Sequence, residues 1–417
     1  MPLSLKELFF KILYPQIEVT VEEDKLVARA SGLKGKFFQR YVNFFFQRLN
    51  AQKVIATPNG SKAFTLFNPP IPSKAGMRAL DARVKERYFG ITTPTSATLA
   101  VTHKCQCRCV HCSAAFFEKF SRGKKEVSTE IVRDVIDGAI DLGIFNIVFT
   151  GGEPLLRKDL FDLIAHVDKD RAQAMMFSNG ASLTRENVEK LRDAGLYALY
   201  VSVDSPVEEE HDRLRGMNGC FRAALEGVER CRKAGILVGL STYATSENIR
   251  DGNLEEVILL AKREGFHEVT IFDCMPAGNF FQQTDKLLTP EEKQCVIHMA
   301  KKYAAMKDYP GVIAQSLINS PLGTGCFGGF YQFYMTVYGE ITPCDFNPIS
   351  FGDVNVDPIK KIWAKMTSHP EFARRSMNCR VQCPEYRKKY IDCLNDPTRL
   401  PVPVEYFNTS NKSAVHQ

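Results

Sequence analysis

The sequence has no long apolar run, a single tryptophan and little net charge. No window reaches 18 consecutive apolar residues, the length a membrane-spanning helix needs. A secretion signal is not expected either, because Lys6 and Lys11 interrupt the first apolar segment and no small-residue cleavage site follows. The net charge of +6, from 54 basic and 48 acidic residues, is too small to indicate a nucleic-acid partner. We therefore expect a cytoplasmic protein that does not bind nucleic acid.

Cysteine, in contrast, is abundant, with 13 residues in a chain of 417. Disulfide frameworks belong mainly to secreted proteins, so in a cytoplasmic chain of this length we expect metal ligation or redox chemistry instead. Apolar residues make up 44% of the chain and charged residues 24%, as in an ordinary globular protein. The length allows more than one domain.

Three zones with different patterns follow one another along the chain. They are an N-terminal α+β extension (residues 1–94), a zone of alternating strands and helices (95–315) and a cysteine-rich zone (316–417). In the first zone, the apolar spacing predicts a helix over residues 3–13, a hairpin over 17–30 and a helix over 37–49. We interpret the three zones as three domains.

The middle zone repeats a buried strand followed by a helix six times. The strands are predicted at residues 97–102, 146–150, 174–178, 199–203, 237–242 and 268–272. The helices are predicted at residues 128–142, 160–167, 185–194, 221–234, 254–263 and 290–306. Such units build a parallel sheet, so the pattern predicts an α/β fold whose sheet is curved or closed into a partial (β/α)6 barrel.

Three cysteines follow the first predicted barrel strand, with the spacing Cys105-x3-Cys109-x2-Cys112. Thiolates are the usual ligands of iron–sulfur clusters, and three ligands on a four-iron cluster leave one iron without a protein ligand. An open position of this kind lets a metal bind a substrate directly. The loop follows the C-terminal end of a strand, where barrel enzymes build their active sites.

A zinc site is the alternative for this loop. Zinc is usually held by four Cys or His ligands, and His103, Cys107 and His111 are close enough in the sequence to supply a fourth. Cys107 is an additional thiol inside the loop. We expect it to be a spectator, although the spacing alone does not assign it.

The cysteine loop resembles the signature of the radical S-adenosylmethionine (radical SAM) superfamily. A second motif of that family follows the second strand, as Gly151-Gly152-Glu153-Pro154. In the family, the glycines let the backbone approach the amino group of the cofactor's methionine, and the glutamate lies beside it. A glycine pair permits such an approach, and a carboxylate suits an ammonium partner.

Later strand ends also resemble the family's cofactor-binding segments. They contribute Ser178 and Asn179 after the third strand, Ser202 and Asp204 after the fourth, and Pro276 and Gly278 after the sixth. The resemblance implies S-adenosylmethionine bound at an open [4Fe–4S] cluster. It further implies reductive cleavage to a 5′-deoxyadenosyl radical, hydrogen abstraction from the substrate, and a low-potential electron donor such as flavodoxin or ferredoxin.

The cysteines of the third zone resemble the twitch/SPASM domain of the same superfamily, which carries auxiliary iron–sulfur clusters. A hairpin is predicted over residues 333–342, turning at Tyr338 and Gly339. Full SPASM domains have seven cysteines, whereas this zone has five. The resemblance therefore implies one auxiliary [4Fe–4S] cluster, with these ligands: Cys326, Cys344, Cys379 and Cys383, and Cys393 as an alternative. A structural zinc site on the same residues is the competing interpretation.

Two further expectations concern single residues of the two cysteine-bearing zones. Asp345, beside Cys344, is a candidate general base, and a solvated or capping aspartate is the alternative. The remaining cysteines are predicted to be small buried apolar residues: Cys220, Cys231, Cys274 and Cys295. A structural or electron-transfer metal protein is the non-enzymatic alternative for the whole chain.

The substrate class is the least determined feature. Enzymes with this resemblance often oxidise or cross-link peptides or proteins, which we favour; sugars or other small molecules, and lipids or isoprenoids, are the alternatives. Residues 33–50 carry four basic side chains and no acidic one, together with an apolar stripe. This segment can lie on a membrane surface, but we favour packing against the barrel or the hairpin, because amphipathic helices usually face a core.

Overall fold

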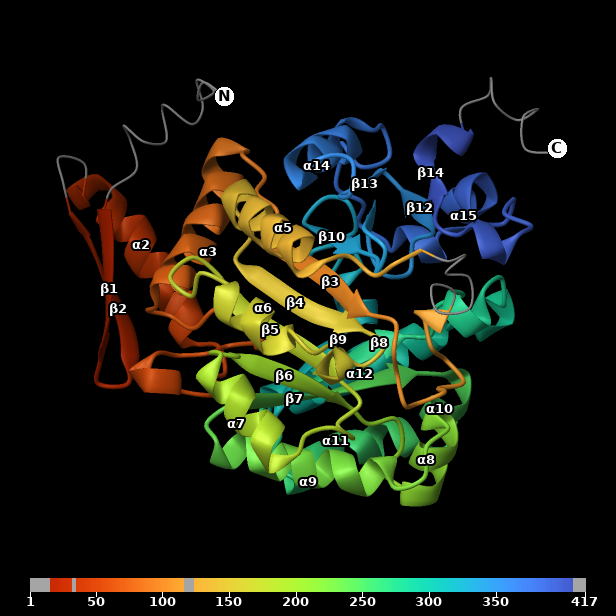
Figure 1. Cartoon of the computed structure of the whole chain (residues 1–417). Helices are drawn as coiled ribbons and strands as arrows, with labels where there is room; N and C mark the ends of the chain where they lie inside the picture. The colour runs from red at the N-terminus through yellow and green to blue at the C-terminus, as the bar shows by residue number, and fades with distance from the viewer. Residues whose placement is uncertain (1–15, 32–34, 116–123, 408–417) are drawn as a thin grey trace.

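The computed structural model describes residues 16–31, 35–115 and 124–407 (Figure 1). The helix expected over residues 3–13 lies outside these ranges. Among the described residues, no helix is both long and apolar enough to cross a bilayer.

A single ten-stranded sheet organises the molecule, in the order β13-β11-β10-β3-β4-β5-β6-β7-β8-β9. All neighbours from β10 through β3 to β9 are parallel. The strands of the middle zone are β3 (Ser96–Thr102), β4 (Asn146–Gly151), β5 (Gln173–Ser178), β6 (Ala198–Ser202), β7 (Leu237–Ala244), β8 (Glu268–Asp273) and β9 (Gly311–Ala314). The six predicted strands are confirmed within a few residues, and β9 is an additional one.

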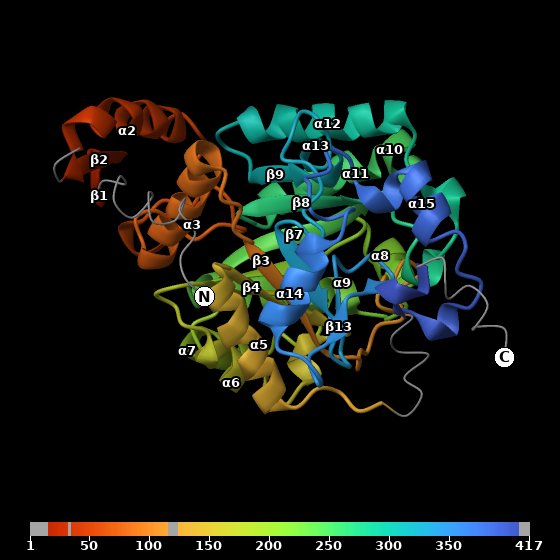
Figure 2. The ribbon, with the colours of Figure 1, turned by 90° about the horizontal axis from the view of Figure 1, so that it is seen from above.

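Helices cover the outer face of the curved sheet (Figures 1 and 2). The main ones are α5 (Thr129–Leu142), α6 (Leu160–His166), α7 (Arg185–Asp193), α9 (Cys220–Lys233), α11 (Asn253–Arg263) and α12 (Pro290–Ala305). Shorter helices are α8 (Glu208–Arg215), α10 (Ser246–Arg250) and α13 (Gln315–Ile318). Local sequence sets several of these boundaries: the Ser128 side chain accepts a hydrogen bond from the Ile131 amide and caps α5, which ends at Gly143 with a φ of 108°.

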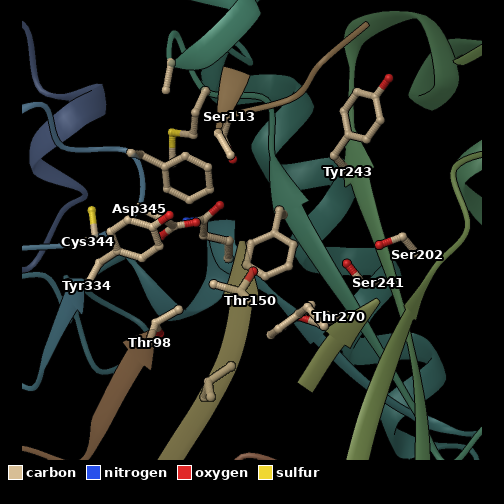
Figure 3. A pocket seen from close by; sticks show the side chains of 18 of the residues that line it. Thr98, Ser113, Thr150, Ser202, Ser241, Tyr243, Thr270, Tyr334, Cys344 and Asp345 are labelled. Atoms are coloured by element: carbon tan, nitrogen blue, oxygen red, sulfur yellow. The ribbon is translucent and has the colours of Figure 1, made fainter. Parts of the chain in front are cut away.

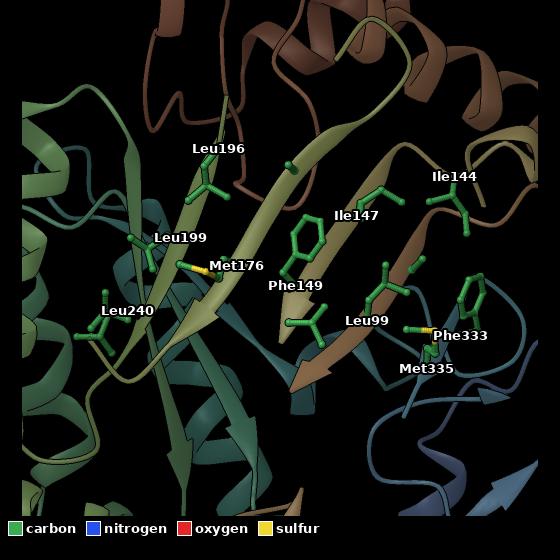
Figure 4. Packing of buried hydrophobic residues seen from close by; sticks show 14 of the residues in the cluster. Leu99, Ile144, Ile147, Phe149, Met176, Leu196, Leu199, Leu240, Phe333 and Met335 are labelled. Carbon is green, nitrogen blue, oxygen red and sulfur yellow. The ribbon is translucent and has the colours of Figure 1, made fainter. Parts of the chain in front are cut away.

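The largest hydrophobic core lies between the sheet and these helices (Figure 4). Leu99, Phe149 and Met176 come from neighbouring strands, and each is completely buried. Phe333 and Met335 of the C-terminal zone belong to the same cluster. The cysteine-rich zone therefore shares its core with the barrel.

The C-terminal zone extends the barrel sheet through a hairpin. Its strands β10 (Gln332–Met335) and β11 (Glu340–Thr342) are antiparallel and turn through Gly339, whose φ is 100°, as predicted. Strand β13 (Gly352–Asp353) pairs with β11. The remaining elements are β12 (Ile349–Ser350), α14 (Ile359–Ser368), α15 (Pro384–Tyr390) and β14 (Val402–Pro403).

The N-terminal zone forms a hairpin and two helices at one side of the barrel (Figure 2). These elements are β1 (Gln16–Glu22), β2 (Lys25–Ser31), α2 (Gly35–Asn50) and α3 (Lys74–Val84). Val42 and Phe46 of α2 are buried in a small core with β2 and α3. Tyr41, Phe44 and Phe45 are exposed. The helix therefore packs on the hairpin, which is the arrangement that we favoured over a membrane surface. It also exposes three aromatic rings.

The segment 65–67 closes the N-terminal end of the barrel. Buried Glu268, at the start of β8, accepts hydrogen bonds from the Leu66 amide (3.0 Å) and the Thr65 hydroxyl (3.1 Å). The Phe67 ring stacks on Tyr200 at 5.0 Å. The candidate functional site lies toward the opposite end of the barrel, where the C-terminal ends of the strands meet.

Candidate functional site

One large cavity of about 1010 Å³ occupies the interior of the barrel. Hydroxyl side chains from several strands line its wall, among them Thr98, Thr150, Ser202, Ser241 and Thr270 (Figure 3). Inward and outward positions alternate along a strand, so these polar residues face the cavity while their apolar neighbours face the helices.

Two sets of cysteines line this same cavity. The first set, Cys105, Cys109 and Cys112, comes from the loop after β3, and the second comes from the C-terminal zone: Cys326, Cys344 and Cys379. The sequence predicted both sets, but it did not predict that they share one cavity.

The cysteine loop is held by backbone hydrogen bonds from two directions. The Arg108 and Val110 amides donate to the carbonyl oxygens of Arg215 (2.8 Å) and Leu214 (3.0 Å) at the end of α8. The Glu153 amide donates to the Lys104 carbonyl at 2.7 Å. These hydrogen bonds fix the course of the loop backbone.

The glycines of the predicted motifs allow these close contacts. A Cβ on Gly152 would lie 2.4 Å from the Lys104 carbonyl oxygen, and one on Gly151 would lie 2.3 Å from that of Thr102. Gly278, with a φ of 58°, packs against the cysteine loop from the other side, and its Cβ would lie 1.9 Å from the Cys112 oxygen. Only glycine permits these approaches.

Two of the loop thiols accept hydrogen bonds from side chains outside the loop. Asn179 Nδ2 lies 3.7 Å from Cys105 Sγ, and Arg215 Nη1 lies 3.6 Å from Cys109 Sγ. A hydrogen bond from Cys107, together with the Arg215 charge, lowers the pKa of Cys109 to about 7 against the opposing effect of burial. The loop thus favours thiolates, the form that binds iron.

Cys107 has a different environment from the other loop cysteines. It is buried, and its Sγ lies 3.7 Å from Met217 Sδ and 3.9 Å from Cys220 Sγ. Hydrogen bonds to Cys105 and Cys109, together with its burial, raise the pKa of its thiol. These contacts are consistent with the expectation that Cys107 is a spectator and not a cluster ligand.

Glu153, two residues after the end of β4, is completely buried. Its carboxylate accepts hydrogen bonds from the Ser178 hydroxyl (3.0 Å), the Asn179 amide (2.8 Å) and the Leu155 amide (3.3 Å). Burial raises its pKa to about 7. The glutamate thus joins the ends of β4 and β5, and Pro154, also buried, begins the turn that follows it.

Asp204 lies in the cavity wall and is ion-paired within the chain. Its Oδ2 lies 2.6 Å from Arg215 Nε and 3.4 Å from His111 Nε2. Burial alone would raise the pKa of Asp204, but the charge of Arg215 holds it below the usual range. Burial lowers the pKa of His111 to about 4, so this ring is neutral.

The other predicted cofactor positions divide into two groups. Ser178, Asn179 and Ser202 line the cavity together with the Gly151–Gly152 pair. After β8, by contrast, the cavity wall is formed by Met275 and Ala277, while the predicted residues Pro276 and Gly278 are buried beside them.

Three of the five C-terminal cysteines converge. Cys379 hydrogen-bonds Cys326, which lowers the pKa of Cys326 to about 5, and Cys344 lies in the same wall. The thiol of Cys383 instead contacts Glu385 Oε2 at 2.8 Å. Cys393 is exposed, with its Sγ 3.5 Å from the Lys389 carbonyl. The choice of a fourth ligand remains a prediction.

Within the described ranges, no three or more His, Cys, Asp or Glu side chains are placed to hold one metal ion. A cluster imposes a different requirement, because its ligands bind separate iron atoms and need not meet at a point.

Asp345 projects into the cavity beside Cys344 and Tyr334 (Figure 3). Burial raises its pKa to about 6. Of the four cysteines predicted to be buried, three are: Cys220, Cys231 and Cys274. The prediction for Cys295 is wrong, because its position on α12 is exposed.

Comparison with known proteins identifies both cysteine-bearing zones. The radical SAM superfamily profile matches residues 99–261, and the profile of an iron–sulfur cluster-binding (SPASM) domain matches residues 326–384. The chain belongs to the radical SAM superfamily. It is an enzyme of the group that carries a SPASM domain, and the matched SPASM range contains four of the five C-terminal cysteines but not Cys393.

The relatives that the chain matches include enzymes named as heme synthases and as peptide cyclases. An AdoMet-dependent heme synthase of Nitratidesulfovibrio vulgaris is 26% identical over 305 residues, covering 67% of this chain and 82% of the relative. A PqqA peptide cyclase of Rhizobium meliloti is 25% identical over 283 residues, covering 66% and 74%. Fe-coproporphyrin III synthase of Methanosarcina barkeri is 33% identical over 199 residues, covering 48% and 49%.

Solved structures with the same fold include Streptococcus suis SuiB bound to its precursor peptide SuiA. That structure has a TM-score of 0.55 and 12% identity, and the match covers 86% of this chain and 88% of SuiB. The structure of anSMEcpe with bound AdoMet has a TM-score of 0.52 and 17% identity, covering 67% and 82%. These similarities confirm the expected fold: a radical SAM barrel followed by a SPASM domain.

Proposed function

We propose that Cys105, Cys109 and Cys112 hold a [4Fe–4S] cluster open to S-adenosylmethionine, and that the enzyme oxidises or cross-links a peptide substrate. When bound, this pair of cofactors supplies a 5′-deoxyadenosyl radical, which removes hydrogen from an unactivated carbon. The observation that carries the proposal is the single cavity, lined by both cysteine sets and by the strand-end residues at which the family binds its cofactor.

The residues of the loop suit an iron–sulfur cluster. Three thiols lie on one loop, and Asn179 and Arg215 donate hydrogen bonds to two of them. Such donors stabilise thiolate ligands of a cluster. Gly151 and Gly152 expose backbone at the cavity beside this loop, where a bulkier side chain would collide with the loop itself.

The chain's own contribution to the reaction is to orient the substrate, exclude water and move a proton. Thr98, Thr150 and Thr270 offer hydroxyls that can bind polar groups of a substrate. Positioning one C–H bond and excluding water are the main sources of selectivity in such a site. Asp345 supplies a carboxylate whose pKa of about 6 suits it to accept a proton near neutral pH.

We assign the auxiliary cluster to Cys326, Cys344, Cys379 and Cys383, with Cys393 as the alternative fourth ligand. One open and one auxiliary cluster correspond to about eight iron atoms per chain, and Cys344→Ala is expected to retain about four. Comparing the iron content of Cys383→Ala with that of Cys393→Ala identifies the fourth ligand. An iron content of about four in the unmodified protein would contradict the auxiliary site.

For the substrate, a peptide is favoured by the PqqA peptide cyclase relatives. A tetrapyrrole is the second candidate, because the relatives also include a heme synthase of which the match covers 82%. Sugars, other small molecules and lipids or isoprenoids remain further alternatives. The proposed electron donor is a flavodoxin or ferredoxin, which must replace dithionite in the assay.

A fractionation experiment separates the substrate classes. The reconstituted enzyme is incubated anaerobically with S-adenosylmethionine, dithionite and the low-molecular-mass fraction of its host's extract, and 5′-deoxyadenosine is measured. For a peptide substrate, we expect the fraction to stimulate product formation and prior protease digestion to abolish that stimulation. Stimulation that survives digestion and follows the porphyrin-absorbing fractions would instead favour a tetrapyrrole.

A further inference from the structure

The C-terminal turn of α8 holds the cysteine loop in place. Besides the two backbone hydrogen bonds from Arg108 and Val110, Gly216 ends the helix with a φ of 60°. A Cβ at this glycine would lie 2.7 Å from the Arg108 carbonyl oxygen. The contact therefore requires the helix to end in this place and conformation, which fixes the backbone of the preceding residue, Arg215.

Arg215 brings a buried positive charge to one thiol of the loop. Its side chain is 11% exposed, and Nη1 lies 3.6 Å from Cys109 Sγ. By comparison, the donor at Cys105 is the neutral amide of Asn179. The two thiols thus have donors of different charge.

The guanidinium is held on its other side by a carboxylate from a different element. Asp204 follows β6 by two residues; its side chain is only 1% exposed and lies 2.6 Å from Arg215 Nε. Asp212, in the middle of α8, accepts a hydrogen bond from the Phe221 amide at 2.9 Å and so fixes the turn that follows. The buried guanidinium of Arg215 thus lies between the carboxylate of Asp204 and the thiol of Cys109.

We propose that Arg215, positioned by Asp204, tunes the reduction potential of the cluster that Cys109 ligates. This inference rests on the proposed function. Reduction adds one negative charge to a cluster, and a fixed cation that donates a hydrogen bond to a ligand sulfur stabilises the reduced form. Arg215 therefore raises the potential, and Asp204 limits that rise because its negative charge lies behind the guanidinium.

Two substitutions test this arrangement because they are expected to shift the potential in opposite directions. Arg215→Gln removes the cation and lowers the midpoint potential of the open cluster. Asp204→Asn removes the balancing anion, keeps a side chain of the same shape and raises the potential. Arg215→Lys retains the charge and should restore most of the wild-type value. General damage to the loop does not produce shifts of opposite sign.

The measurement is an anaerobic redox titration of the reconstituted protein, followed by electron paramagnetic resonance. The open cluster is identified by the change that S-adenosylmethionine causes in its spectrum, and iron content is measured in parallel. Arg213→Gln is the matched control, because this exposed arginine of the same helix pairs with Glu210; its potential should equal that of the wild type.

The possible outcomes distinguish this inference from the proposed function. A loaded Arg215→Gln protein with unchanged potential overturns the inference, as does a shift of the same sign in Asp204→Asn. A wild-type protein that assembles no open cluster contradicts the proposed function itself.

Discussion

The buried carboxyl of Glu268 provides a quantitative prediction about how the N-terminal zone is held to the barrel. Glu268 is 1% exposed and accepts hydrogen bonds from Tyr200, Thr65 and the Leu66 amide. Burial raises its pKa from 4.5 to about 7. In an opened state, in which the segment 65–67 has left the barrel and water reaches this carboxyl, the pKa of Glu268 returns to about 4.5.

The sign of the effect follows from proton linkage. Between the two pKa values the closed state binds more protons than the opened state, so its stability falls as the pH rises. The contribution of Glu268 to the stability of the closed state is fully present below pH 4.5 and is lost as the pH rises through about 7. A difference of about 2.5 units corresponds to roughly 3 kcal/mol, which is on the order of a 100-fold change in the opening equilibrium.

Hydrogen exchange of the peptides covering residues 62–70 measures this equilibrium in the loaded protein. After correction for intrinsic exchange, we expect protection of the wild-type segment to fall by about two orders of magnitude between pH 5 and pH 8. Glu268→Gln, which has no charge to bury, should show a nearly flat profile. Glu256→Gln, at an exposed position of α11, is the control and should behave as the wild type. Identical profiles for wild type and Glu268→Gln would refute the reasoning.

Three further predictions concern the site and the surface. Gly278→Ala should lower the iron content, since its Cβ would lie 1.9 Å from the Cys112 oxygen; normal loading and activity would contradict the proposed packing. Asp345→Asn should still release 5′-deoxyadenosine but lose roughly 100-fold in modified product; unchanged product formation would remove Asp345 as the base. Phe45→Asp should abolish sedimentation with anionic vesicles if the exposed rings of α2 contact membranes; wild-type protein that does not sediment would exclude this contact.

The fold was predictable where the pattern is repeated. Six units of apolar strand and amphipathic helix gave the parallel barrel and most element positions within a few residues. Strand β9 was missed because Gly311–Ala314 has only four residues and carries little periodic signal. The pairing of β10 with β3 was missed for a different reason: it joins Gln332 to Ser96, and no local pattern reports contacts between such distant segments.

The site was predictable in its cysteines and only partly in its other residues. Motif spacing placed Cys105, Cys109 and Cys112 on one loop, as found. The sequence could not show that Asp204 is ion-paired to Arg215, because this pairing depends on how α8 docks on the loop. The spacing Cys379-x3-Cys383 likewise could not show that Cys379 lines the cavity while the Cys383 thiol contacts Glu385.

The central claim is that the loop of Cys105, Cys109 and Cys112 starts radical chemistry from S-adenosylmethionine. The most direct test is anaerobic incubation of the iron- and sulfide-reconstituted protein with dithionite and S-adenosylmethionine, followed by quantification of 5′-deoxyadenosine. We predict release by the wild-type protein and none by Cys109→Ala, while Cys295→Ala, at an exposed position on α12, behaves as the wild type. No 5′-deoxyadenosine from the loaded wild-type protein, or equal amounts from Cys109→Ala, would contradict the account.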